Sequence, residues 1–453
     1  MSEKTVYILG AGASVSSNLP TQAGLLSLVF SIRPSSFLQI SLDLDILEVE
    51  INNNMQRIQE FYSRFDRYRQ NIGRFILSNF SSQDKLAQYN FAIQHADNIE
   101  QIDNDAITKR EEYLFKAYEI VKSVNITLED VFTIFDSVNS GREHFRLYSP
   151  KEMDDLHNEL KLCIIYALSY SINVSCDKSD YVLFSEMLIN ERIKTSQKID
   201  SMAIITMNWD DVFENTLYNI CEKYNSVLTK NQQRIYPDLC FYNYDLHNSN
   251  SHIPSTHIKA KGHKNIKILK MHGSLAWLEC PKCRRIYTDF NTEIAYEEFS
   301  GIECPHCKSE RCECNENPIL RNLIITPTFM KSLDNLNIKN IWHNAFIDLS
   351  EADNLVFIGY SFPDADFEMR CLLKKATQNN VKIKVVLSKW DNPELYANKF
   401  KDKGYSADEV SELISRMHLP EERYKTFFGE ENVEFYYEGF GEFIRKKAGV
   451  LSE

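Results

Sequence analysis

The sequence has few of the residues that break or loosen a fold. It contains only 14 Gly and 12 Pro among 453 residues, too few for long disordered linkers. Hydrophobic residues make up 43% and charged residues 25% of the chain, close to the averages of globular proteins. Because single cores seldom grow beyond about 250–300 residues, the length predicts either a main domain with large insertions or two to three domains.

Long apolar runs and an excess of basic charge are also missing. No window reaches the roughly 18 uncharged apolar residues that a membrane-spanning helix needs, and no apolar segment precedes the first predicted strand. We therefore expect a cytoplasmic protein that does not contact a membrane. The formal net charge of -13 opposes non-specific binding of DNA or RNA, which requires a basic surface. No direct nucleic-acid binding is expected, and a local basic patch remains open.

Cysteine is scarce except in one segment. Six of the 11 cysteines lie between Cys280 and Cys314, a clustering that favours a metal over a disulfide framework in a reducing compartment. The ligand pattern is Cys280-x-x-Cys283 and Cys304-x-x-Cys307, with 20 residues between the two motifs. That is the spacing of a four-thiolate zinc ribbon, and a closed set of four thiolates indicates a structural ion. Two neighbours could replace a ligand, Cys312 or Cys314, and His306 could do so less readily.

Short apolar runs rich in β-branched residues predict the strands. They lack polar alternation, which favours a parallel sheet covered by helices on both faces. The fold class expected is therefore α/β, a Rossmann-like doubly wound parallel sheet. The predicted strands are residues 6–9, 203–207, 266–271, 323–326, 355–360, 381–387 and 433–437.

A helical pattern separates the first strand from the second. Apolar residues recur every three or four positions from Ile51 to Phe75, as on an amphipathic helix. Thr127 and Asp130 fit a capping box, and residues 159–172 predict a buried helix. The polar stretch from about 225 to 264 is either a long loop or a small subdomain. The predicted bounds are a core of residues 1–30, 201–278 and 318–453, a helical insertion at 31–200 and a zinc-ribbon module at 279–317.

The first strand runs into a glycine loop, Gly10-Ala11-Gly12-Ala13-Ser14, before a predicted helix. Backbone amides and a helix N-terminus at such a place can hold a phosphate. The same turn also occurs for packing reasons, and the third glycine of the usual dinucleotide fingerprint is missing.

Polar residues follow other predicted strands. Thr206-Met207-Asn208-Trp209-Asp210 follows the second strand, where Asn208 and Asp210 could hydrogen-bond a ribose and an amide or could cap a helix. His272 follows the strand ending at Met271 and could act as a general base near neutral pH, although a lone histidine is more often structural. Gly359-Tyr360-Ser361 follows a further strand. If these strands are parallel, their ends converge on one crevice.

In this order the motifs resemble those of the sirtuin family, the NAD-dependent deacylases and their NAD-cleaving relatives. Sirtuins have a GAGxS loop followed by Ile-Pro, and here GAGAS is followed by Leu19-Pro20. Their Thr-Gln-Asn-Ile-Asp motif is similar to residues 206–210, and their His-Gly to His272-Gly273. A zinc ribbon follows at once in both, and a late Gly-Thr-Ser turn is similar to residues 359–361. The resemblance covers residues 1–30 and about 200–445.

The resemblance implies a role for each matching residue. His272 would act on the nicotinamide ribose or its attacking water, and Asn208 would position that ribose or water. Asp210 would hold the nicotinamide carboxamide. The remaining NAD+ contacts, to phosphate or ribose, would come from Gly10, Ala11, Gly12, Ser14, Thr206, Gly359 and Ser361.

Departures from the family pattern bear on the second substrate. Deacylating sirtuins bind the acyl-lysine peptide with a Phe-Gly-Glu segment after the zinc module, and here IITPTFMKSL, residues 324–333, stands in its place. Thr21-Gln22-Ala23 replaces the Asp-Phe-Arg that follows the first Ile-Pro in the family. What stays intact is the set of residues that breaks the nicotinamide-ribose bond.

These observations lead to a hypothesis with two alternatives. The chain is expected to be an NAD+ hydrolase that releases nicotinamide and ADP-ribose and carries structural zinc. The helical insertion, IITPTFMK and GYSFPDAD at residues 359–366 resemble sirtuin-like proteins of bacterial antiphage systems. The resemblance implies a triggered effector that forms a homo-oligomer or works with a HerA-type ATPase or an Argonaute. The alternatives are an NAD-dependent protein deacylase or ADP-ribosyltransferase, and a module that senses NAD or ADP-ribose without cleaving it.

Overall fold

The structure, a computed structural model, describes residues 3–33, 48–99, 104–229, 232–240, 243–245, 252–253, 263–288, 302–308, 318–331, 333–378, 380–403, 405–417 and 419–449. The chain divides into two compact units. One comprises residues Met1–Leu19, Ser175–Ile325 and Ser332–Glu453, and the other comprises Pro20–Val174 and Thr326–Lys331.

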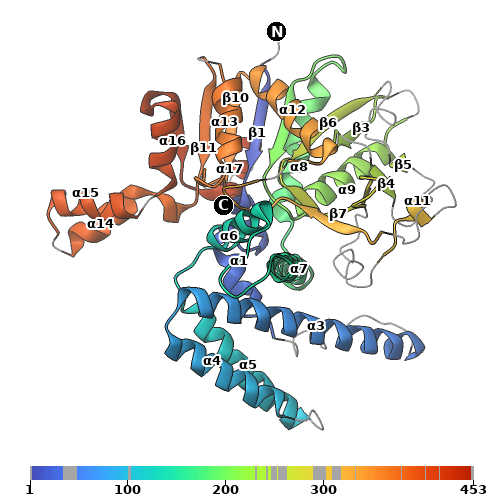
Figure 1. Ribbon diagram of the computed structural model, residues 1–453. Coiled ribbons are helices and arrows are strands. Elements are labelled where there is room, and N and C mark those ends of the chain that lie inside the picture. The colour runs from blue at the N-terminus through green and yellow to red at the C-terminus, as the bar shows by residue number, and fades with distance from the viewer. Residues whose placement is uncertain are drawn as a thin grey trace. The chain divides into compact units, whose positions relative to one another are not determined.

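A seven-stranded sheet forms the centre of the first unit (Figure 1). Its strand order is β12-β11-β10-β1-β2-β6-β3, and each neighbouring pair is parallel. The strands are β1 (Thr5–Leu9), β2 (Met202–Thr206), β3 (Ile235–Asp238), β6 (Lys264–Lys270), β10 (Asn354–Ile358), β11 (Lys382–Val386) and β12 (Val433–Tyr436). This confirms the predicted Rossmann-like parallel sheet.

Alternate side chains of the central strand enter two different cores. Val6 and Ile8 belong to a hydrophobic cluster with Ile341 and Leu349 of α12, whereas the ring of Tyr7 packs edge to face on Phe184 of α8 at 5.4 Å. Both faces of the sheet are therefore covered, which explains why its strands lack polar alternation.

The helices of this unit are α8 (Ser179–Lys194), α9 (Val212–Ser226), α11 (Pro305–Lys308), α12 (Leu336–Ser350), α13 (Phe367–Ala376), α14 (Pro393–Asp402), α15 (Ala407–Arg416), α16 (Pro420–Phe428) and α17 (Gly439–Ala448), with 3-10 helices η1 (Ala11–Ser17), η2 (Lys389–Asp391) and η3 (Glu430–Asn432).

A smaller sheet has five strands in the order β5-β4-β8-β7-β9, and its strand β7 follows β6 directly. Its strands are β4 (Asn243–Asp245), β5 (His252–Ile253), β7 (Gly273–Glu279), β8 (Ile286–Thr288) and β9 (Arg321–Ile324). The prediction that residues 323–326 join the parallel sheet is wrong, because β9 pairs antiparallel with β7. A short apolar run looks the same in either sheet, so the sequence could not distinguish the two.

The helix predicted after the glycine loop is present as η1, a 3-10 helix. One further element differs from the sequence prediction. The polar stretch around residue 235 supplies β3, the edge strand of the parallel sheet. Its sequence, IYPD, contains a proline, which an edge strand tolerates but which weakens a strand prediction. Buried Asn225 holds β3 by exchanging hydrogen bonds of 2.8 and 3.0 Å with the backbone of Ile235.

The second unit is helical. It contains α1 (Gln22–Val29), α3 (Glu48–Phe80), α4 (Gln83–Asp97), α5 (Asn104–Lys122), α6 (Leu128–Gly141) and most of α7 (Pro150–Ser175). The capping box at the start of α6 is confirmed, since Thr127 and Asp130 bond each other's backbone amides. Buried Arg69 joins α3 to the end of α1 by donating to the carbonyls of Val29 at 3.2 Å and Ile32 at 2.7 Å.

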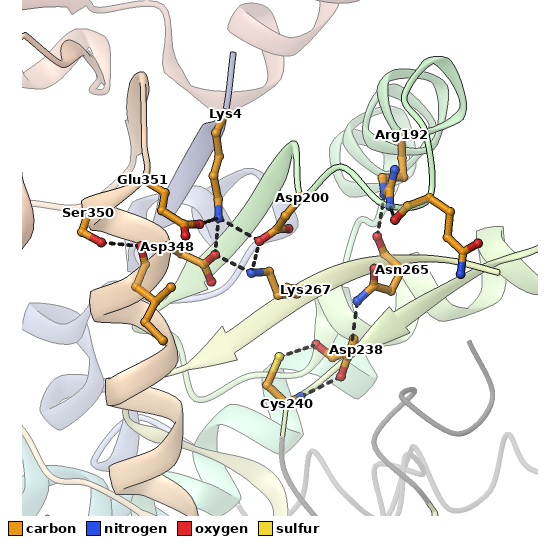
Figure 2. A network of polar contacts seen from close by, with 12 residues as sticks. Lys4, Arg192, Asp200, Asp238, Cys240, Asn265, Lys267, Asp348, Ser350 and Glu351 are labelled. Carbon is orange, nitrogen blue, oxygen red and sulfur yellow. Dashed lines mark hydrogen bonds and ion pairs between the residues drawn. The ribbon is translucent and has the colours of Figure 1, made fainter. Parts of the chain in front are cut away.

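Charged side chains gather at the amino ends of the central strands (Figure 2). The Lys4 ammonium, which precedes β1, lies 2.8 Å from Asp200, 2.6 Å from Asp348 and 2.7 Å from Glu351. Lys267 of β6 pairs with the same Asp200 and Asp348. The network joins segments almost 350 residues apart, at the edge opposite the carboxyl ends of the strands.

None of the helices in the part of the chain described here is both long and apolar enough to cross a membrane.

Candidate functional site

The carboxyl ends of β1, β2, β6 and β10 carry the residues singled out from the sequence. From β1 the chain continues to β2, which pairs with one edge of β1. The later strand β10 pairs with the opposite edge of β1, so the strand order of the sheet reverses between β1 and β10. In open α/β sheets ligands bind outside the strand ends at such a reversal. Four separate segments of the chain therefore meet where a ligand site is expected.

The two glycine turns lie directly against each other. The Gly12 amide donates to the Gly359 carbonyl at 2.8 Å, and the Gly10 amide donates to Ile358 at 3.0 Å. A Cβ on Gly12 would lie 2.7 Å from the Gly359 Cα, and Gly359 itself has φ +61°. Glycine is thus required here for close packing of the β1 and β10 ends. Ser361, at the end of the second turn, is exposed.

Ser14 is the centre of a buried hydrogen-bond network. Its hydroxyl donates to Asp210 Oδ2 at 3.0 Å and accepts from Asn208 Nδ2 at 3.1 Å. The Tyr181 hydroxyl lies 2.9 Å away, and because Ser14 has one proton to give, Tyr181 donates in this arrangement. Side chains from η1, the β2 end and α8 therefore hold one another in fixed orientations.

Asn208 has one polar atom left over. Its backbone amide donates to Thr206 Oγ1 at 3.1 Å, which fixes the turn, and its Nδ2 is used by Ser14. Its Oδ1 is buried and has no hydrogen-bond partner among the described residues. A buried acceptor without a donor costs roughly 1–3 kcal/mol, and this cost disappears when a ligand supplies the donor.

His272 lies at the junction of the two sheets. β6 ends at Lys270 and β7 begins at Gly273, so the histidine occupies the short turn between them. Its Nε2 is 3.7 Å from Asp366 Oδ1, and both side chains are less than a tenth exposed. The distance exceeds that of a hydrogen bond but allows the carboxylate to stabilise a protonated ring. The Trp342 indole donates to Met271 at 3.0 Å, which holds the residue before it.

Asp366 is a candidate site residue that sequence reasoning missed. It occupies the N-cap position of α13 without making a capping bond, because its carboxylate accepts from the Tyr360 hydroxyl at 2.8 Å instead. The signal was present in the GYSFPDAD segment, where Asp366 follows Tyr360 by six positions. Only the structure shows that this aspartate is beside His272.

Asp210 is accompanied by further charges. Burial raises the pKa of its carboxyl, and the neighbouring Lys270 ammonium opposes that rise. Burial likewise raises the pKa of Glu214 to about 7. The Lys270 ammonium lies 2.9 Å from Glu214 and donates to the Asp210 carbonyl at 2.6 Å. Sequence reasoning did not identify Lys270 or Glu214.

The four cysteines expected to bind zinc come together at the end of β7. The Sγ atoms of Cys280, Cys283, Cys304 and Cys307 lie within 4.8 Å of one another. The Cys280–Cys307 and Cys283–Cys304 sulfur separations are 3.9 and 3.7 Å. A tetrahedral ion with bonds of about 2.3 Å spaces its sulfurs by about 3.8 Å, so the donors fit Zn²⁺. His306 is outside this group, and Cys312 and Cys314 lie outside the described residues.

Comparison with known proteins gives a family for this architecture. Residues 202–407 match the family model for the SIR2-like domain. The match includes Asn208, Asp210, His272 and Gly359 as well as the four cysteines, and it excludes the glycine loop at residue 10. The chain therefore carries a SIR2-like domain over residues 202–407, a little under half of its length.

Solved structures at low similarity are also sirtuins. One is a Sir2 homologue in complex with NAD, with 12% identity, a TM-score of 0.35, and coverage of 99% of this chain and 89% of that one. Another comes from work on sirtuin substrate affinity, with 12% identity, a TM-score of 0.33, and coverage of 99% and 95%. No match was found among curated proteins.

Proposed function

We propose that this chain is an NAD+ hydrolase that cleaves the nicotinamide-ribose bond to give nicotinamide and ADP-ribose. The observation that carries the proposal is the convergence of Asn208, Asp210 and His272 at the β2 and β6 ends, with a buried Asn208 oxygen that lacks a donor. The SIR2-like domain match supports the choice of NAD+ as substrate.

The proposed reaction needs one bond broken and one formed. The bond between the ribose C1′ and the nicotinamide nitrogen breaks, and its electron pair leaves with nicotinamide, which becomes neutral. Water attacks the resulting oxocarbenium-like carbon and loses a proton. His272 accepts that proton as general base, and the Asp366 carboxylate at 3.7 Å stabilises the charged imidazole. The overall products are nicotinamide, ADP-ribose and a proton.

Asn208 and Asp210 orient the reactants. The free Oδ1 of Asn208 would accept a hydrogen bond from the attacking water or a ribose hydroxyl, which holds the nucleophile in place. The Asp210 carboxylate would accept from the nicotinamide amide N–H group. Ser14 fixes both side chains through its hydroxyl and so acts indirectly.

The β1 loop is proposed to face the phosphates. The amides of Gly10, Gly12 and Ala13 already donate to protein carbonyls, so these groups shape the loop. Ala11 begins η1, where the first amides of a helix lack intrahelical acceptors. We assign the closest phosphate contact to Ala11, with Gly359 and Ser361 contributing from the adjacent turn after β10 and Thr206 shaping the β2 end.

Zinc has a supporting role in this proposal. Held by Cys280, Cys283, Cys304 and Cys307, it would brace the end of β7 without an open coordination position for substrate.

Water is proposed as the acceptor because of what replaces the peptide segment of deacylases. Residues 326–331 belong to the helical unit. There the Phe329 amide donates to Thr133 Oγ1 of α6 at 3.2 Å, and Thr328 lies 3.4 Å from the same hydroxyl. A backbone amide and a side chain that already bond α6 favour a structural segment over an open edge for an acyl-lysine peptide.

The biological setting proposed is a triggered effector of a bacterial antiphage system. Uncontrolled NAD+ cleavage would deplete the cell, so activity is expected to depend on an oligomer or a partner such as a HerA-type ATPase or an Argonaute. The resemblance of the helical segment and GYSFPDAD to such proteins supports this setting.

The deciding experiment incubates purified protein with NAD+ and follows nicotinamide and ADP-ribose, alone and with proteins encoded beside it. His272→Ala should reduce turnover by roughly 10²–10⁴-fold. Transfer of ADP-ribose to protein, or acyl-lysine cleavage at a higher rate, would instead show the transferase or deacylase. NAD+ binding without turnover under every condition would show a sensor and refute the hydrolase.

A further inference from the structure

A buried charge cluster lies beside the turn that carries Asn208 and Asp210. The Lys270 ammonium, with no exposed side-chain surface, lies 2.9 Å from Glu214 Oε1 and 3.4 Å from Asp211 Oδ1. It also donates to the Asp210 backbone carbonyl at 2.6 Å. One lysine on β6 therefore contacts the carboxylates of Asp211 and Glu214 and the backbone of Asp210, all at or just before the start of α9.

The cluster joins the two halves of the proposed site. Lys270 precedes His272 by two residues, and Ser274 follows it by two. Ser274 donates to the Asp211 carboxylate, which also accepts from the Ala276 amide at 3.1 Å. Asp211 occupies the N-cap position of α9 but makes no capping bond. The segment with His272 is thus fastened to the segment with Asn208 on both sides of the histidine.

The charges of the cluster do not balance. Asp210, Asp211 and Glu214 carry three carboxyl groups, and Lys270 supplies one ammonium. Glu214 Oε2 is buried with no hydrogen-bond partner among the described residues. Ionised groups out of water are costly unless they are paired, so removal of the lysine would drive protonation of these carboxyls. Lys270 is the strongest influence opposing the raised pKa of Asp210.

We propose that Lys270 is a positioning residue that fixes the Asp210–Asp211 turn and keeps the Asp210 carboxylate ionised for the nicotinamide carboxamide. This inference rests on the proposed function. An ionised carboxylate accepts the amide N–H group of the substrate, whereas a protonated carboxyl would present a donor to it. Lys270 thereby sets the lowest pH at which the substrate binds well.

Other groups face Asp210 as well, and they define the controls. Asp211 and Glu214 approach from α9, Ser14 from η1, and Tyr181 and Cys176 from α8 and the residues before it. Among the groups named here Lys270 is the one cation, so its removal leaves only acidic and neutral groups around Asp210, whereas changes at Tyr181 or Cys176 remove no positive charge.

The test compares three variants: Lys270→Met, Lys270→Arg and the double variant Lys270→Met/Glu214→Gln. The double variant replaces both members of the ion pair with neutral side chains of similar size, so it is used if Lys270→Met alone fails to fold. With NAD+ as probe, KM is measured from pH 5 to 9. We expect Lys270→Met, and the double variant to a smaller extent, to raise KM about tenfold at pH 6 while kcat at pH 8 changes less than about threefold. Lys270→Arg should follow the wild type. Identical KM profiles in all variants would overturn the inference while leaving the hydrolase intact.

A ligand-free measurement decides the inference even if NAD+ is not the substrate. Urea unfolding of wild type and Lys270→Met is compared at pH 7.5 and pH 4.5, and again in an Asp210→Asn background. The destabilisation by Lys270→Met should be larger at pH 7.5, and this pH difference should fall by at least half once Asp210 is removed. The same pH difference in both backgrounds would show that Lys270 does not control Asp210. A wild type that neither binds nor cleaves NAD+ would refute the proposed function separately.

Discussion

At the scale of single residues, two aspartates of the candidate site do not cap the helices at whose starts they lie. Asp366 and Asp211 both occupy N-cap positions, yet neither makes the capping bond. Asp366 accepts from the Tyr360 hydroxyl and lies 3.7 Å from His272, and Asp211 accepts from Ser274, two residues after His272. A helix start normally favours a capping aspartate by roughly 1 kcal/mol, and here that stabilisation is given up for orientation of the site.

Asp366→Asn should lower kcat for NAD+ cleavage by roughly ten- to a hundredfold, less than the loss from His272→Ala. The amide keeps the shape of the carboxylate but cannot stabilise a protonated His272, so KM should change little. Steady-state kinetics at pH 7.5 measure the effect. Asp364→Asn is the matched control, because that aspartate is 68% exposed and pairs with Arg370. Equal kcat in the two variants would contradict the role given to Asp366.

The raised pKa of Glu214 predicts a pH-dependent stability. Its folded pKa of about 7 lies above the ordinary 4.5, so the folded state binds this proton more tightly. The associated stability is fully present below pH 4.5 and is lost as the pH rises to about 7, on the order of 3 kcal/mol at most. Glu214→Gln should flatten that part of the profile in urea unfolding. Glu222→Gln, exposed on the same helix, should leave it unchanged, and a wild-type slope in Glu214→Gln would disprove the assignment.

At the scale of elements, the zinc module has a clear test. Purified protein should contain about one zinc per chain, and Cys280→Ser/Cys283→Ser should lose the metal and fold poorly, since metal binding contributes folding free energy. Metal analysis and circular dichroism follow both properties. Cys371→Ser, which alters a cysteine of α13 outside the cluster, should keep the zinc. Wild-type protein with a metal content near zero would contradict the zinc ribbon.

The start of α6 offers a second element-level prediction. Thr127 Oγ1 accepts from the Asp130 amide at 3.1 Å, and Asp130 Oδ2 accepts from the Thr127 amide at 3.1 Å. Thr127→Ala removes the first of these bonds and should destabilise the protein by about 1 kcal/mol in urea unfolding. Ser140→Ala, exposed near the other end of α6, should cost less than about half of that. A smaller loss for Thr127→Ala than for Ser140→Ala would mean that the box does not stabilise the helix.

At the scale of the whole molecule, the Lys4 network connects the beginning of the chain with α12. Lys4→Met leaves Asp348, whose side chain is 1% exposed, with Lys267 as its remaining partner. A fully broken buried pair costs roughly 3–5 kcal/mol, so the retained Lys267 reduces the expected loss to about 2 kcal/mol. Thermal unfolding measures it. Lys382→Met, which removes a 68% exposed lysine 3.5 Å from Glu3, should cost roughly 0–1 kcal/mol. Equal losses of stability in Lys4→Met and Lys382→Met would contradict the stabilising role of the network.

Much of the architecture could be predicted because it depends on local patterns. Apolar runs identified β1, β2, β6, β10, β11 and β12, since strands covered on both faces must be apolar along their length. The Thr127–Asp130 box and the paired Cys-x-x-Cys motifs are also local, because each needs residues at fixed short spacings. The run at residues 323–326 was placed in the wrong sheet and the β3 edge strand was missed, since pairing partners are not encoded in a short run.

The sequence by itself determined the sheet class, the four cysteines that cluster and which strand ends carry polar residues, because these follow from periodicity and spacing. The tertiary structure decided what those residues do to one another. It showed Ser14 between Asn208 and Asp210 across almost 200 residues, Asp366 beside His272, and Lys270 within a group of carboxyls. Such contacts depend on the order and register of strands distant in the chain, and no local pattern specifies these.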